Sequence, residues 1–197
     1  MKKILFVFLL FVSQISLGQY YDPDYAKKQN EKVSLEKVIF SLDAFSPGLT
    51  IESAIGPQNS IVTSFATGIA ISTVIYSNGD RESEVFLYPL LSASYRNYYN
   101  LDKRKLEGKP VAFNSGNYFG LHVSYQSDPF SNEGRIFNQY NTGFMAGPVW
   151  GIQRNGTFTF NFCVGPGLFA SGQDDLSLTI IGDLSVGLNL TKLFRKE

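Results

Sequence analysis

The chain has 197 residues, and its 17 basic and 17 acidic side chains balance to a net charge of zero, which gives no indication of a nucleic-acid partner. Cys163 and His122 are its only cysteine and histidine, so the composition excludes a disulfide framework and a cysteine–histidine metal site. Charged residues make up 17% of the chain and aromatic residues 15%, with 18 glycines, a composition typical of an all-β protein with frequent turns.

The N-terminus has the organisation of a secretory signal peptide. Two lysines precede an apolar run over residues 4–12, and small residues follow up to Gly18. We expect residues 1–18 to be a signal peptide; a membrane anchor is the alternative, although the run is shorter than the ~20 apolar residues of a spanning helix. Residues 19–35 are polar and predict a flexible periplasmic leader or a short helix.

Beyond residue 35, segments of alternating apolar and polar residues are separated by turn residues, which is typical of antiparallel strands. The first two segments are also compatible with one bent strand through Ser46-Pro47-Gly48. We expect about eight strands, at residues 36–45, 48–56, 60–74, 83–98, 117–127, 136–151, 156–169 and 176–190.

The connections between these segments are of two kinds. Tight turns are expected at 56–59 and 153–156, and longer polar loops at 77–82, 127–134 and 171–175. If the strands run up and down, the tight turns share one end and the loops the other, as in outer-membrane barrels with short periplasmic turns. At the short-turn end, residues 100–108 predict a short helix that Asn100 caps and Gly108 ends.

Large apolar residues and small polar residues occupy opposite faces of these strands. In the stretch TFTFNFCVGPGLF at 157–169, the phenylalanines share one parity with Leu168, whereas Asn161 and the threonines share the other. The outer face of a water-soluble sheet would be rich in charged residues, but here the second face is mainly Gly, Ala, Ser, Thr and Asn. We therefore expect the apolar face to point outward into lipid and the small polar face to fill a closed barrel.

Two further patterns favour a barrel of this kind. About ten residues at ~3.3 Å each, tilted by ~40°, rise roughly 25 Å, the height of an outer-membrane apolar band. Aromatic residues near the strand ends are expected to form interfacial girdles, namely Tyr88, Tyr95, Tyr98, Tyr99, Tyr118, Tyr125, Tyr140 and Trp150.

The stretch YRNYYNLDKRKLEGKPVAFNSGNYFGL at 95–121, together with the signal peptide and the alternating strands, resembles small outer-membrane β-barrel proteins of Gram-negative bacteria, of the OmpA/OmpX-like size class. The resemblance implies a closed antiparallel up-and-down transmembrane β-barrel over residues 36–194, located in the cell outer membrane. It also implies outer-membrane lipid and the barrel-assembly machinery as partners, and no cofactor. Such barrels commonly end on an aromatic residue, whereas here Phe194 is followed by Arg195-Lys196-Glu197.

Four ionisable residues are expected in the lumen, namely Glu52, Arg96, His122 and Asp183. Because buried charges are unfavourable unless paired, we expect Arg96 to contact Glu52 or Asp183 and the cluster to be structural. A proton-linked or ligand-binding role is the alternative. The basic residues Lys103, Arg104, Lys105 and Lys109 are expected to be a solvated surface; contact with a periplasmic partner or anionic head groups is the alternative use.

The favoured function is therefore a non-enzymatic barrel of structural or partner-binding type, with a narrow, filled lumen and binding loops that face a periplasmic or extracellular protein. The first alternative is a lipid A deacylase-like enzyme, which His122 and Ser124 suggest by their shared parity, although no other catalytic signature accompanies them. The second is a soluble lipocalin-like carrier of an apolar ligand. No motif for a cofactor, a metal or nucleic acid is present in the sequence.

Overall fold

The computed structural model describes residues 33–130, 142–171 and 176–195, so the predicted signal peptide and most of the predicted leader lie outside the described residues. Eight antiparallel strands pair in chain order, and β8 pairs with β1 to close the ring. This confirms the predicted all-β barrel. The strands are β1 (Val38–Asp43), β2 (Gly48–Ala54), β3 (Asn59–Ile75), β4 (Arg81–Tyr98), β5 (Asn117–Gln126), β6 (Gly143–Asn155), β7 (Phe158–Ser171) and β8 (Leu176–Asn189).

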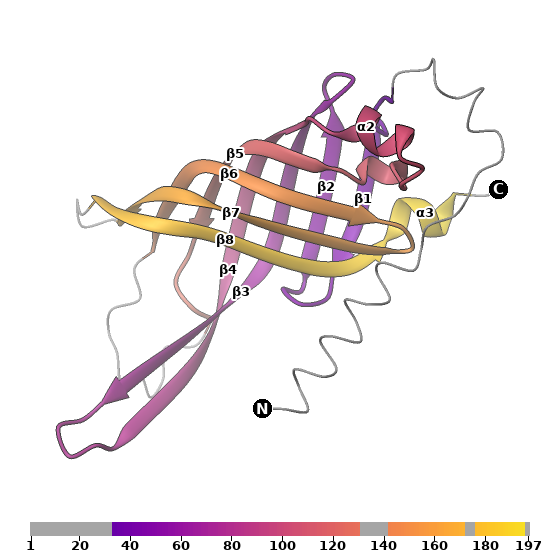
Figure 1. Cartoon of the computed structure of the whole chain (residues 1–197). Helices are drawn as coiled ribbons and strands as arrows, with labels where there is room; N and C mark the ends of the chain where they lie inside the picture. Colours follow the sequence, from indigo (N-terminus) through magenta and orange to yellow (C-terminus); the bar gives the residue numbers. More distant parts are fainter. Residues whose placement is uncertain (1–32, 131–141, 172–175, 196–197) are drawn as a thin grey trace.

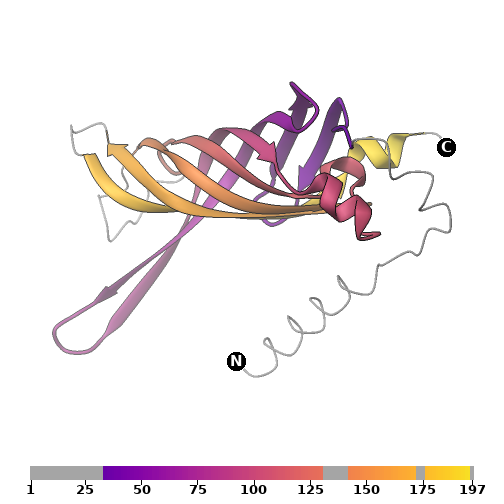
Figure 2. The ribbon, with the colours of Figure 1, turned by 45° about the horizontal axis from the view of Figure 1, so that its top comes forward.

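Two helices lie at one end of the barrel, which we call the helical end (Figures 1 and 2). They are α2 (Leu101–Leu106) and α3 (Leu190–Phe194), and a 3₁₀ turn, η2 (Ala112–Asn114), follows α2. Because the strands run up and down, the β2–β3 and β6–β7 turns share this end, and the β3–β4, β5–β6 and β7–β8 connections share the opposite, loop end. The predicted distribution of turns and loops is confirmed.

The structure defines the limits of three strands, β1, β2 and β6, that the sequence left open or placed differently. β1 and β2 are separate strands, paired from Val38↔Ser53 to Asp43↔Gly48. The tight turn predicted at 153–156 lies about two residues later, because β6 continues to Asn155, which pairs with Thr159, and β7 begins at Phe158. The first part of the predicted strand 136–151 lies outside the described residues, and β6 begins at Gly143.

Helix α2 lies where the sequence predicted a helix. Asn100 is in the N-cap position, but its side chain makes no capping bond; its Oδ1 accepts a hydrogen bond from the Asn117 N–H at 2.7 Å instead. Gly108 has a φ of 68°, a left-handed conformation that ends the helix as expected. The Asn100 side chain therefore ties the connection between β4 and β5 to the start of β5.

Side-chain orientation follows the predicted parity. Phe158, Leu121 and Ile180 are 69%, 59% and 77% exposed on the outside of the barrel. Ser124 and Asn161, from the opposite parity, are buried inside. The outside of the barrel is thus apolar, which is the reverse of a soluble β-barrel, and the inside combines small polar residues with buried apolar ones such as Ile39, Val62 and Ile181.

The seam between β1 and β8 is short and ends at α3. The two strands pair only from Ser41↔Asn189 to Asp43↔Gly187. Beyond Asn189 the chain turns into α3, where the Thr191 hydroxyl accepts a hydrogen bond from the Phe40 N–H at 2.8 Å. Phe194 consequently lies on a helix and is 79% exposed, rather than at the end of a strand.

The β3–β4 hairpin extends far beyond its neighbours at the loop end (Figures 1 and 2). Its two strands pair from Asn59↔Asn97 to Ile75↔Arg81. The ladder between β2 and β3 ends at Ala66, and the ladder between β4 and β5 ends at Leu90. The outer half of the hairpin therefore projects as a two-stranded arm.

Candidate functional site

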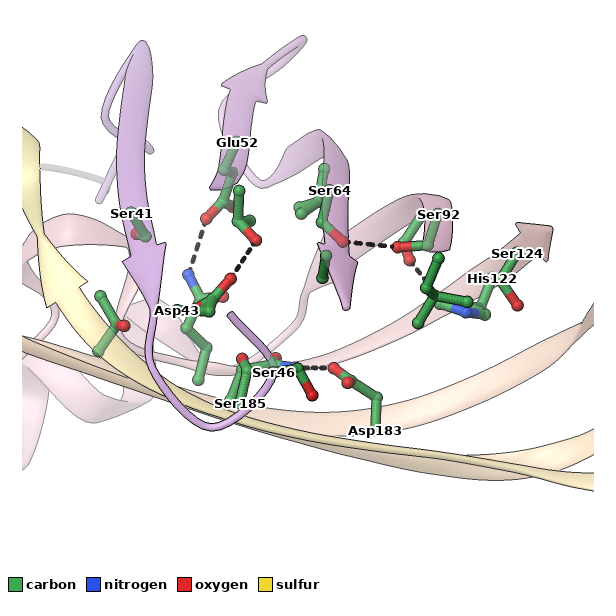
Figure 3. Close-up of a pocket in the computed structure, with 18 of the residues that line it drawn as sticks. Ser41, Asp43, Ser46, Glu52, Ser64, Ser92, His122, Ser124, Asp183 and Ser185 are labelled. Carbon is green, nitrogen blue, oxygen red and sulfur yellow. Dashed lines mark hydrogen bonds between the residues drawn. The ribbon is translucent and has the colours of Figure 1, made fainter. Parts of the chain in front are cut away.

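The interior of the barrel holds a cavity of about 150 Å³ that polar and apolar side chains line together (Figure 3). Its lining combines hydroxyl groups, carboxylates and the one imidazole of the chain, contributed by strands all around the ring. The polar residues that line it include Ser41, Asp43, Thr50, Glu52, Ser64, Ser92, Ser94, Arg96, His122, Ser124, Gln153, Asn161, Asp183 and Ser185. All four predicted lumen residues are among them.

Glu52 accepts hydrogen bonds from three donors in the buried part of this interior. Its Oε1 accepts from the Ser60 hydroxyl at 2.8 Å and from the Tyr98 hydroxyl at 2.9 Å. Its Oε2 accepts from Gln153 Nε2 at 2.7 Å. A carboxylate removed from water needs such donors, so these bonds stabilise Glu52 in its buried position.

Arg96 is connected to Glu52 through Gln153. The Arg96 Nη1 donates to Gln153 Oε1 at 2.6 Å, and its guanidinium carbon lies 4.5 Å from the centre of the Tyr118 ring. Within the described part of the chain, no ion pair within 4.0 Å joins Arg96 to Glu52 or Asp183. The predicted contact between opposite charges is thus replaced by an amide relay and a cation–π contact.

Asp183 joins the same region from the other side of the lumen. Its Oδ2 accepts a hydrogen bond from Asn161 Nδ2 at 3.0 Å, and Asn161 Oδ1 accepts from the Tyr118 hydroxyl at 2.8 Å. A further carboxylate, Asp43, accepts from the Thr50 hydroxyl at 2.6 Å. Asp183 is therefore connected to Arg96 through Asn161 and the Tyr118 ring. Asp43 also lines the cavity, and the sequence did not indicate it as a lumen residue.

His122 lies apart from these carboxylates in the hydrogen-bond network. Its Nδ1 is 2.8 Å from the hydroxyl of Ser94, its partner on the neighbouring strand β4. Both side chains are buried inside the barrel. Ser124, which the sequence paired with His122 as a candidate nucleophile, makes no hydrogen bond to it among the described contacts. The imidazole therefore bonds to a different serine from the one predicted.

Three residues of this network were placed elsewhere by the sequence. Tyr98 and Tyr118 were assigned to the aromatic girdle, but both are fully buried inside the barrel. They share strand parity with Arg96 and His122, and this signal was available in the sequence. Gln153 was assigned to a turn. The girdle assignment fits Tyr95, Tyr99 and Trp150 better: Tyr95 and Tyr99 are exposed, and Trp150 Nε1 donates to the Tyr99 hydroxyl at 2.9 Å. Tyr140 lies outside the described residues.

The basic cluster at the helical end divides into two kinds of residue. Arg104 is half-buried, and it donates to the carbonyl oxygens of Ser115 and Pro110 at 3.0 Å each, so it is not the solvated side chain that was predicted. Burial lowers the pKa of this guanidinium. Lys109 Nζ lies 2.7 Å from a Glu107 carboxylate oxygen, and this hydrogen bond lowers the pKa of Glu107.

The chain matches no protein-family model, and no curated protein or solved structure is significantly similar to it. Within the described ranges, no three His, Cys, Asp or Glu side chains are grouped so that they could hold a metal ion. None of the helices in the described part of the chain is long and apolar enough to cross a bilayer.

Proposed function

We propose that this protein is an integral outer-membrane β-barrel of a Gram-negative bacterium, with a structural or partner-binding role. The observation that carries the proposal is the band of exposed apolar side chains, to which every strand contributes. Each of the following is at least 47% exposed: Phe40, Leu49, Phe65, Leu91, Leu121, Phe144, Phe158 and Ile180, one from each of β1 to β8. A continuous apolar belt of this size is unfavourable in water and favourable in lipid.

The interior supports a filled barrel over a wide pore. Eight strands enclose a space that side chains nearly fill, and the remaining cavity is only about 150 Å³. Gln153 bonds to both Arg96 and Glu52 across it. The charged groups of Asp43, Arg96 and Asp183 in the lining also support a membrane barrel over a lipocalin-like carrier, since an apolar ligand would cut such groups off from water.

The contacts of His122 favour a non-enzymatic role. A serine hydrolase needs its serine bonded to the base and accessible to the substrate. The serine bonded to His122 is Ser94, which is 6% exposed and points into the lumen, whereas a lipid substrate would lie on the outer surface. We therefore assign the Ser94–His122 pair a structural role in the lumen.

In this proposal, outer-membrane lipid contacts the apolar belt and the barrel-assembly machinery inserts the chain. The helical end lies in the periplasm and the loop end outside the cell. The projecting arm of β3 and β4 is the surface we assign to a protein partner outside the cell, because exposed loops on a rigid scaffold commonly carry binding sites.

Membrane fractionation with heat-dependent gel mobility tests this proposal. We expect the chain to be recovered in the sarkosyl-insoluble fraction and to migrate differently before and after boiling, because a folded barrel resists detergent until it is heated. A soluble chain, recovered without detergent and able to bind apolar dyes, would contradict the proposal and favour the carrier.

A further inference from the structure

Strand β8 extends beyond its partner β1 at the loop end (Figure 1). β1 ends at Asp43, and the next residue, Ala44, donates its N–H to the Val186 carbonyl at 2.8 Å. β8 continues for a further ten residues, to Leu176, and no described strand pairs with it on the β1 side there. This segment of β8 therefore has one unpaired edge.

The backbone groups on that edge follow from the register. The Asn189 N–H donates to the carbonyl oxygen of Thr157, the residue before β7. The Val186 carbonyl oxygen accepts from the N–H of Ala44, the residue after β1. Successive residues of an antiparallel strand direct their N–H and C=O groups to opposite sides. The β7–β8 register is continuous, so odd-numbered residues bond to β7 and even-numbered residues face the edge. The edge groups belong to Leu178, Ile180, Gly182 and Leu184, and they bond to no other described residue.

This edge lies at the depth of the apolar belt. The side chains of Leu178, Ile180 and Leu184 are 87%, 77% and 40% exposed on the outside of the barrel. β1 has six residues and rises only about 15 Å along the barrel, less than the ~25 Å of an outer-membrane apolar band. Backbone groups without partners are strongly unfavourable in hydrocarbon, so a membrane barrel of this shape requires something to pair with β8.

We propose that the free edge of β8 is a docking site for an extended amphipathic strand of a partner polypeptide, running antiparallel to β8. The inference rests on the membrane assignment proposed above. Natural sheets protect free edges with charged residues or proline, but Asp183 is the only charged residue in β8, and the strand contains no proline. Like β8 itself, the docked strand would alternate apolar residues facing lipid with small polar residues facing the lumen.

A second copy of this chain does not fit the site. Two copies in one membrane have the same orientation, so a two-fold axis between them runs along the membrane normal. Their β8 strands would then run in the same direction, with the lipid face of one continuing into the lumen face of the other. A separate polypeptide, free to run antiparallel to β8, keeps both faces in register, so we assign the edge to such a partner.

Amide hydrogen exchange of the folded, lipid-embedded protein tests the proposal at single residues. We expect the N–H groups of Leu178, Ile180, Gly182 and Leu184 to exchange at least about tenfold faster than those of their odd-numbered neighbours, which bond to β7. A synthetic peptide of alternating Leu and Thr should protect the even-numbered amides, whereas a peptide with the same composition in two blocks should not. Equal protection without peptide, or no protection with the alternating peptide, would overturn the proposal.

Two substitutions at Gly182 provide a matched pair. A Cβ added at Gly182 meets no atom within 4 Å, so alanine fits the folded barrel. In the proline variant the ring Cδ takes the place of an edge N–H that has no partner among the described residues. Gly182→Pro removes the edge N–H without removing a bond to β7, and we expect it to weaken peptide protection about tenfold or more, whereas Gly182→Ala should retain it. Equal peptide protection in both variants would overturn the proposal. Fractionation of the wild-type chain tests membrane insertion separately. If the barrel is inserted but the even-numbered amides of β8 are already protected without peptide, the docking proposal is contradicted and the proposed membrane function is not.

Discussion

Arg96 and Glu52 are held in one buried network without touching, because Gln153 accepts from Arg96 at 2.6 Å and donates to Glu52 at 2.7 Å. The three residues come from β4, β2 and β6, so the amide crosses the lumen between two charges of opposite sign. Tyr98 and Ser60 bond to the same carboxylate. The relay thus connects three walls of the barrel at its helical end.

We expect Gln153→Leu to lower the free energy of unfolding by about 2–4 kcal/mol, because it leaves a buried guanidinium and a buried carboxylate each without one partner. Urea unfolding in lipid vesicles, followed by the fluorescence of the single tryptophan, Trp150, measures the change. Thr159→Val is the matched control: the Thr159 hydroxyl is buried and has no partner among the described residues, so its loss should be neutral or stabilising. Equal effects of the two substitutions would contradict the relay.

Leu121→Arg distinguishes a lipid-facing surface from a water-facing one. Leu121 is 59% exposed in the middle of β5. At the midplane of a bilayer an arginine there should cost about 2–4 kcal/mol, whereas Phe130→Arg, in the loop that follows β5, should cost about 0–1 kcal/mol. In water, both exposed substitutions would be near neutral. Folding yield into vesicles and urea unfolding give both values, and a neutral Leu121→Arg would count against a membrane barrel.

The side of each strand was predictable from the sequence because burial alternates with the same period of two as the side chains. The identity of the buried network was less predictable. Tyr98 and Tyr118 share parity with the lumen residues, but their size and position near strand ends favoured a girdle. Gln153 lies two residues before the Asn155-Gly156 pair, which is a strong turn signal, so the sequence predicted a turn at this position. In the structure Gln153 belongs to β6 and pairs with Asn161 on β7. Contacts across the lumen depend on barrel closure, which a single sequence does not specify.

Arg104→Ala should loosen the connection between β4 and β5. The Arg104 side chain donates to the carbonyls of Ser115 and Pro110, and hydrogen bonds from a charged donor are worth about 1.5–3 kcal/mol. We expect faster amide exchange through residues 110–116 and earlier cleavage there by an added protease. Lys103→Ala, on the neighbouring and largely exposed side chain, is the control and should leave this segment unchanged. If both substitutions had the same small effect, the cluster would be a solvated surface, as the sequence alone suggested.

Gly151→Ala and Gly182→Ala should have opposite effects on stability, although both glycines lie within strands. A Cβ at Gly151 would overlap the Tyr118 ring and lie 2.8 Å from the Phe162 carbonyl oxygen, so Tyr118 would have to move away from Arg96 and Asn161. Such overpacking typically destabilises a protein by about 1–3 kcal/mol. At Gly182, where the space is open, alanine should stabilise by about 0.4–1 kcal/mol because it restricts the unfolded chain. Urea unfolding of the two variants measures the difference; a Gly151→Ala barrel as stable as the wild type would show that Tyr118 does not fill the lumen as described.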